Sequence, residues 1–142
     1  AGMPLFAGAP AFTSHLVLQP RIGAVPFSGS DAPMEIGAWL GLAEARPIDA
    51  LSLAFFSDAL FSPPFIRLTA PSTTPTIDLT IHFRTPMPRV ARPDPEELCF
   101  ARFRSGLIHE GFFEEDGVIW ASDGTVLAQS RQLGIVLPRA IG

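Results

Sequence analysis

The chain has 142 residues, of which 47% are hydrophobic and 17% are charged. This balance is typical of one globular domain with a packed core, and it excludes a disordered chain or a membrane-spanning protein. The formal net charge is -4, and the ten basic residues, all arginine, are scattered along the sequence. Without a basic stripe we expect no nucleic-acid partner, although neighbouring arginines such as Arg102 and Arg104 can meet a phosphate.

The cysteine, histidine and glycine patterns exclude several kinds of site. The single Cys99 leaves neither an intrachain disulfide nor a four-cysteine metal site, and in its apolar segment it is expected to be a core residue. His15, His82 and His109 fall in separate predicted strands, and the sequence has no phosphate-binding glycine loop and no serine-hydrolase elbow. We therefore predict no metal and no cofactor. One cysteine and no visible secretory signal favour the reducing cytoplasm.

The N-terminal part of the chain predicts an arm followed by two strands. Residues 1–11 are rich in Gly, Ala and Pro without periodicity, which predicts a loose N-terminal arm or linker. The remaining residues, 12–142, are expected to form a single domain. Residues 12–21 and 34–44 contain enough β-branched and aromatic residues for two strands, with a turn-rich segment between them.

A helix is predicted next, over residues 47–61. Pro47 and Asp49 suit its first turn, and the sequence Ser62-Pro63-Pro64 ends it. The interior of this segment is apolar on every side, which is typical of a helix surrounded by protein.

Residues 76–83 alternate strictly between apolar and polar side chains, which predicts a strand. One face of this strand is expected to carry Ile77, Leu79, Ile81 and Phe83. The other face is expected to carry Thr76, Asp78, Thr80 and His82. A Pro-rich connection follows over residues 84–97.

Four further strands are predicted, over residues 98–105, 107–115, 118–122 and 125–137. The pairs Asp116-Gly117 and Asp123-Gly124 mark reversals or bulges, and the second pair suits a two-residue hairpin turn. The acidic run at residues 114–116 predicts a solvated turn. Two strands, one apolar helix and an antiparallel meander describe a sheet wrapped around a central helix, so the predicted fold class is α+β with hotdog architecture.

Three segments in this order resemble the acyl-CoA thioesterase II-like family. They read Phe-Phe-Ser-Asp-Ala-Leu at residues 55–60, Thr-Ile-Asp-Leu-Thr-Ile-His-Phe at residues 76–83, and Asp-Gly-x-x-x-Ala-Gln-Ser-x-Gln at residues 123–132. The similarity covers residues 12–137 and is to the C-terminal hotdog repeat of a two-repeat chain. The family strand commonly has histidine directly after its aspartate, whereas Leu79 stands there in this sequence, so the chain resembles a divergent branch.

The resemblance implies an enzyme that hydrolyses fatty acyl-CoA thioesters with water. It places the catalytic roles on Asp58 near the helix end, Thr76 at the start of the following strand, and Gln132 on the last strand. These groups suit the chemistry, because a carboxylate with a raised pKa can take a proton from water while a hydroxyl and an amide orient that water. Candidate walls of an acyl-chain tunnel are Trp39, Phe55, Phe56 and Phe61.

Structural explanations stay open for each candidate residue. Asp58 can be solvated or can cap a neighbouring amide, and Thr76 is simply a good strand former. Gln132 can bond the backbone of an adjacent strand, since a buried amide without a partner costs about 1–3 kcal/mol. His82 shares the predicted strand face of Thr76, where it is either a further site residue or a surface imidazole.

The chain is long enough for only one hotdog, so a second hotdog domain is expected as its partner. That partner is either another copy of this chain, in a homo-oligomer, or a cleaved N-terminal half. The expected substrate is acyl-CoA, and no membrane partner is expected. The alternative function is a noncatalytic hotdog domain that binds acyl chains or serves in assembly. A hotdog dehydratase would need a histidine near the helix start, and residues 47–51 contain none.

Overall fold

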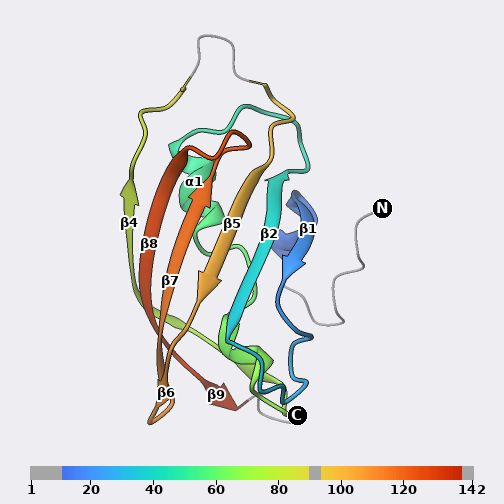
Figure 1. Cartoon of the computed structure of the whole chain (residues 1–142), viewed down its shortest axis with the longest axis vertical. Coiled ribbons are helices and arrows are strands. Elements are labelled where there is room, and N and C mark those ends of the chain that lie inside the picture. Colours follow the sequence, from blue (N-terminus) through green and yellow to red (C-terminus); the bar gives the residue numbers. More distant parts are fainter. Residues whose placement is uncertain (1–10, 90–93, 139–142) are drawn as a thin grey trace.

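The computed structural model describes residues 11–89 and 94–138, and within them an antiparallel sheet wraps around one helix, α1 (Ala50–Phe56) (Figure 1). The strands of the main sheet lie in the order β1-β2-β5-β7-β8-β4, with the short β6 paired to β7. Their bounds are β1 (Leu16–Ile22), β2 (Glu35–Leu42), β4 (Thr76–Phe83), β5 (Cys99–Arg104), β6 (Ile108–His109), β7 (Phe112–Trp120) and β8 (Val126–Ile135). This arrangement confirms the predicted α+β hotdog class.

Smaller elements complete the described chain. β3 (Ser72–Thr73) pairs with β9 (Leu137–Pro138) in a separate two-stranded sheet. There are two 3-10 helices: η1 (Ala11–His15) precedes β1, and η2 (Pro63–Ile66) follows α1. The predicted arm lies outside the described residues except for Ala11, which begins η1. None of the helices in the described ranges is long and apolar enough to cross a membrane.

The core lies between α1 and the face of the sheet that α1 covers, which we call the inner face. Leu53 and Phe56 on α1 have no exposed surface. They belong to one cluster with inner-face side chains of four strands, including Ile36, Ala38, Leu40, Cys99, Ala101, Phe103, Ile119 and Ala128. Because full burial of one such large apolar side chain is worth about 1.5–3 kcal/mol, this cluster is what holds the helix to the sheet. Cys99 is part of it, as the sequence predicted.

The helix is shorter than predicted, and its caps explain both ends. Asp49 stands before the first turn and not in it, where its carboxylate accepts the backbone N–H of Ser52 at 2.7 Å in a capping box. Ser57 caps the C-terminus, and its hydroxyl donates to the carbonyl oxygen of Leu53 at 2.8 Å. Leu51 is 76% exposed, so the prediction of a helix surrounded on every side is wrong.

β7 runs unbroken through Asp116-Gly117, so the prediction of a reversal or bulge at this pair is wrong. Gly117 pairs with Phe103 on β5 and with Ser130 on β8. A Cβ at position 117 would collide with the Phe103 ring and the Ser130 hydroxyl, so close packing and not a turn requires the glycine. The reversal lies at Glu110-Gly111, between β6 and β7, where both residues have positive φ, 51° and 84°. A two-residue hairpin turn needs that backbone.

The hairpin predicted at Asp123-Gly124 is confirmed, because this pair joins β7 to β8. The loop is one residue longer than the two-residue turn expected. The backbone N–H of Ala121 donates to the carbonyl of Thr125 at 2.8 Å, and three residues lie between them. Gly124 has φ 87° and supplies the left-handed position that such three-residue loops need.

Candidate active site

Gln132 lies on the inner face of β8 and has polar partners at both ends of its amide. The side chain is 4% exposed. Its Oε1 accepts the Thr76 hydroxyl at 2.8 Å, and its Nε2 donates to Glu115 Oε1 at 2.8 Å. The partners of Gln132 are therefore side chains from two other strands, β4 and β7, and not the backbone of an adjacent strand.

Thr76 reaches Gln132 because β4 contains a bulge. Thr76 pairs with Gly134 on β8 and Leu79 pairs with Gln132, with an irregularity in the register between Thr76 and Asp78. The extra residue, Ile77, reverses the alternation, as β-bulges do. Thr76 therefore shares the inner face with Leu79, and the prediction that it shares a face with His82 is wrong.

Asp58 stands in the turn that follows α1, one residue after the C-cap. Its backbone N–H donates to the carbonyl of Phe55 at 3.2 Å, which continues the helix by one tight turn. The side chain keeps contact with solvent, yet the protein around it removes enough water to raise the pKa of its carboxyl. A hydrogen bond from the Gln132 side chain acts in the opposite direction and lowers this pKa. The structure thus brings Asp58, Thr76 and Gln132 together around one amide.

Glu115 is the fourth polar group at this place, and the prediction that it lies in a solvated turn is wrong. It is on the inner face of β7 and is 5% exposed. The pKa of its carboxyl is raised to about 8, chiefly by burial; the Gln132 hydrogen bond opposes this rise, and the nearby negative charge of Asp58 adds to it. A period-two pattern from Phe113 to Ile119 would have placed Glu115 on the apolar face, but the expected reversal at residue 117 interrupted it.

The aromatic residues expected to line a tunnel divide between the two faces of the sheet. Phe56 is fully buried in the core, whereas Phe55, also on α1, and Phe61, in the segment after α1, are half-buried. Trp39 pairs with Phe100 and packs against its ring at 5.3 Å, on the face turned away from α1. The prediction of Trp39 as a tunnel wall is therefore wrong. Side chains alternate along β2, so Ala38 and Leu40 face the core and Trp39 points to the other side of the sheet.

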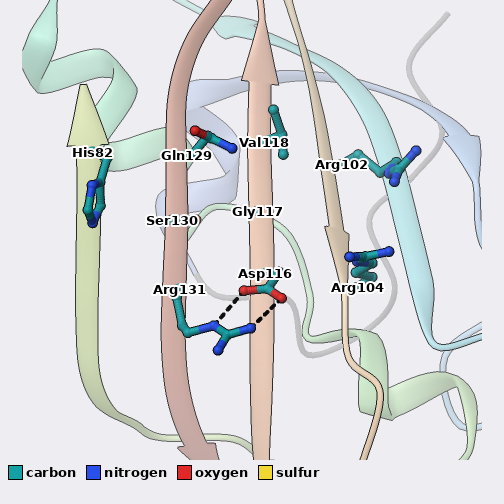
Figure 2. A pocket seen from close by; sticks show the side chains of 9 residues that line it. All are labelled: His82, Arg102, Arg104, Asp116, Gly117, Val118, Gln129, Ser130 and Arg131. Atoms are coloured by element: carbon teal, nitrogen blue, oxygen red, sulfur yellow. Dashed lines mark hydrogen bonds and ion pairs between the residues drawn. The ribbon is translucent and has the colours of Figure 1, made fainter. Parts of the chain in front are cut away.

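The outer face of the sheet has a shallow hollow of about 390 Å³ over β4, β5, β7 and β8, shown in Figure 2. Arg131 makes a two-bond ion pair with Asp116 at 2.7 Å, and the hydrogen bond from Arg131 lowers the pKa of the Asp116 carboxyl. Arg102 pairs with Glu35 at 3.1 Å. These pairs neutralise most of the positive charge, and the sheet separates the hollow from Gln132. Within the described ranges, no three His, Cys, Asp or Glu side chains are placed to hold a metal ion.

The sequence was compared with known protein families and solved structures. The profile of the acyl-CoA thioesterase C-terminal domain family matches residues 1–136. The chain belongs to this family. The resemblance found in the sequence is thereby confirmed. A comparison with curated proteins found no match.

Solved structures that match the chain have the same fold at low sequence identity. A hotdog protein from Alicyclobacillus acidocaldarius matches with a TM-score of 0.79 and 20% identity, covering 96% of this chain and 51% of the other. A putative thioesterase II from Thermobifida fusca matches with a TM-score of 0.64, 22% identity and coverages of 96% and 56%. The acyl-CoA thioesterase II TesB2 from Mycobacterium marinum matches with a TM-score of 0.66, 14% identity and coverages of 99% and 58%. The chain thus spans little more than half the length of these proteins.

Proposed function

We propose that this domain hydrolyses fatty acyl-CoA thioesters, with Asp58, Thr76 and Gln132 holding the attacking water. The observation that carries the proposal is the inner-face contact between Thr76 and Gln132, at 2.8 Å, beside a carboxyl whose pKa is raised. Residues 56 positions apart in sequence meet there through a strand bulge. Membership of a thioesterase family supports the choice of thioester hydrolysis among the reactions that such a group can catalyse.

The hydrogen-bond directions define how a water is held. The Thr76 hydroxyl donates its one hydrogen bond to Gln132, so towards a water its oxygen can only act as an acceptor. Asp58 in its ionised form is also an acceptor. A water that donates one proton to each of them presents its lone pair to a thioester carbonyl carbon.

The reaction then needs no covalent intermediate with the protein. The water oxygen bonds to the carbonyl carbon while Asp58 takes one proton from the water as general base. The tetrahedral intermediate collapses as the carbon–sulfur bond breaks, and the leaving CoA thiolate takes the proton that Asp58 accepted from the water, which returns Asp58 to its ionised form. The products are a carboxylic acid and free CoA thiol, so the atoms balance with one water consumed.

The substrate follows from the surroundings of the site. Phe55 on α1 and Phe61 after it offer half-buried apolar surface for an acyl chain, and surface arginines can meet the phosphates of CoA. Two hotdog proteins whose fold matches this chain, from Streptococcus mutans and Streptococcus pneumoniae, were solved with acetyl CoA and with coenzyme A. Their identity to this chain is 8%, so they support the ligand class only by analogy of fold.

A second hotdog domain completes the unit in this proposal. β4 is one of the two edge strands of the main sheet, and Ile77 and Phe83 on it are 51% and 50% exposed. Asp58 and Thr76 are exposed beside this edge. An open edge with apolar side chains favours pairing, and the matched structures from Alicyclobacillus, Thermobifida and Mycobacterium are nearly twice as long as this chain. The partner is another copy of the chain or a separate N-terminal half, which light scattering and intact-mass analysis distinguish.

The same open edge also favours the alternative, a noncatalytic acyl-binding or assembly domain. The two functions differ in one assay, the release of free thiol from medium- and long-chain acyl-CoA. Asp58→Ala and Gln132→Ala are expected to lower kcat by about 10²–10³. Gln129→Ala is the matched control, because Gln129 is an exposed glutamine on the outer face of the same strand. Full activity in both site variants would remove the proposed site, and no thiol release from the wild type would favour the noncatalytic domain.

A further inference from the structure

Glu115 is buried more deeply than the neighbouring acidic residues Glu114 and Asp116, and the proposed reaction gives it no role. Its Oε1 accepts the Gln132 amide at 2.8 Å. Its Oε2 is buried and has no hydrogen-bond partner in the described part of the chain. A carboxylate with one of its two oxygens unpaired in the interior is costly, whereas a protonated carboxyl carries no charge there.

The Gln132 amide has a donor end and an acceptor end, and its orientation decides what Thr76 does. With Nε2 toward Glu115, the oxygen faces Thr76 and takes its hydroxyl proton, so the threonine oxygen accepts from water. With the amide reversed, Nε2 donates to the threonine oxygen and the hydroxyl proton points elsewhere. The hydroxyl alone permits either state, since it can donate or accept.

We propose that Glu115 is a positioning residue whose carboxyl group, together with the Asp58 carboxylate that also accepts from the Gln132 side chain, fixes the orientation of the Gln132 amide and, through it, the role of Thr76. Its catalytic consequence rests on the proposed thioesterase function, but the contact itself does not. Glu115 touches no reacting atom in this scheme. It acts by keeping the acceptor end of Gln132 toward β4.

The charge state of Glu115 is set by few neighbours. Asp58 is the titratable group that acts on it from the inner face, and its negative charge disfavours ionisation of Glu115. Asp116 on β7, Arg102 and Arg104 on β5, and Arg131 on β8 are charged too, but they line the outer hollow on the opposite side of the sheet (Figure 2). Burial thus keeps Glu115 neutral at pH 7, with a pKa of about 8. Ionisation above that pH adds a second negative charge beside Asp58, which opposes the negative charge that develops on the thioester oxygen.

Two substitutions separate positioning from packing. Glu115→Leu replaces the carboxyl with an apolar side chain of similar size and so removes the acceptor, and kcat for decanoyl-CoA is expected to fall roughly 10- to 100-fold with KM little changed. Glu115→Gln keeps an acceptor oxygen without a titratable proton, and it is expected to restore most of that kcat and to abolish the decline of wild-type kcat above about pH 8. Glu114→Gln makes the same change one residue away on the outer side of β7 and is expected to keep the wild-type pH profile.

A spectroscopic readout makes the test independent of activity. The side-chain amide resonances of Gln132 in the full chain are expected to shift with pH around 8 in the wild type, and to lose this shift in Glu115→Gln. Wild-type protein that releases no thiol but shows this titration overturns the proposed function and supports the positioning contact. Amide resonances that do not respond to pH, or Glu115→Leu with wild-type kcat and pH profile, overturn the positioning role.

Discussion

The burial of Glu115 makes the stability of the domain depend on pH, and Glu115→Gln tests this without any substrate. The ordinary pKa of a glutamate is 4.5, and in the folded protein the Glu115 carboxyl titrates at about 8. Below pH 4.5 the carboxyl is protonated in both states and costs nothing. As the pH rises from 4.5 to 8, the unfolded chain ionises and the folded chain does not, so the unfolded state gains stability. Each pH unit in this window is worth about 1.4 kcal/mol, so about 3 kcal/mol of folding stability is lost by pH 7.

The assay is urea unfolding of the wild type and of Glu115→Gln at pH 5 and pH 7. The glutamine keeps the acceptor for Gln132 and cannot ionise, so the variant is expected to gain about 2–3 kcal/mol on the wild type between the two pH values. All other titrating groups are shared by the two proteins and cancel in the difference. A stability difference that is the same at pH 5 and pH 7 would refute the reasoning, because Glu115 would then ionise equally in both states.

Three further expectations concern the site and the sheet. Thr76→Val is expected to lower kcat by roughly 10- to 100-fold while Thr76→Ser, which keeps the hydroxyl, restores most of it; steady-state thiol release measures both. The fall of kcat/KM on the acid side is expected at a pH above 3.8, the ordinary pKa of aspartate. Burial raises the pKa of Asp58, and the base works only when it is deprotonated. A pH profile showing full activity down to about pH 4 would contradict this. Gly117→Ala is expected to cost about 1–3 kcal/mol in thermal or urea unfolding, since its Cβ meets the Phe103 ring, and an unchanged stability would show that β5 and β7 can separate freely.

The order and type of the main elements could be predicted because each depends on local pattern. Strict alternation marked β4 with the bounds that the structure has, and the apolar segment before Pro63 marked the only α-helix of the described chain. The helix ends were less accurate, because a capping aspartate and a first-turn aspartate look alike in sequence. Asp49 makes its bond to a backbone N–H three residues on, and only the geometry shows which role it has.

The site residues were named from motifs, but the contacts between them could not be. The Thr76 to Gln132 bond depends on the bulge at Ile77, and a bulge is decided by pairing with β8 and not by the alternation within β4. Glu115 was missed for a related reason. The sequence suggested that Gly117 is a turn residue, whereas it leaves room for the Phe103 ring to pack against β7. This role can be recognised only from the pairing of β5 with β7.

The central claim is that water attacks the thioester directly while Asp58 acts as base. Its most direct test is one turnover of decanoyl-CoA, with enzyme in excess, in water enriched in the heavy oxygen isotope. Mass spectrometry of the released decanoic acid is expected to show one heavy oxygen per molecule in that first turnover. Acid that carries only ordinary oxygen, with the heavy isotope appearing in Asp58 instead, would show that the carboxylate attacks as a nucleophile and would contradict the account.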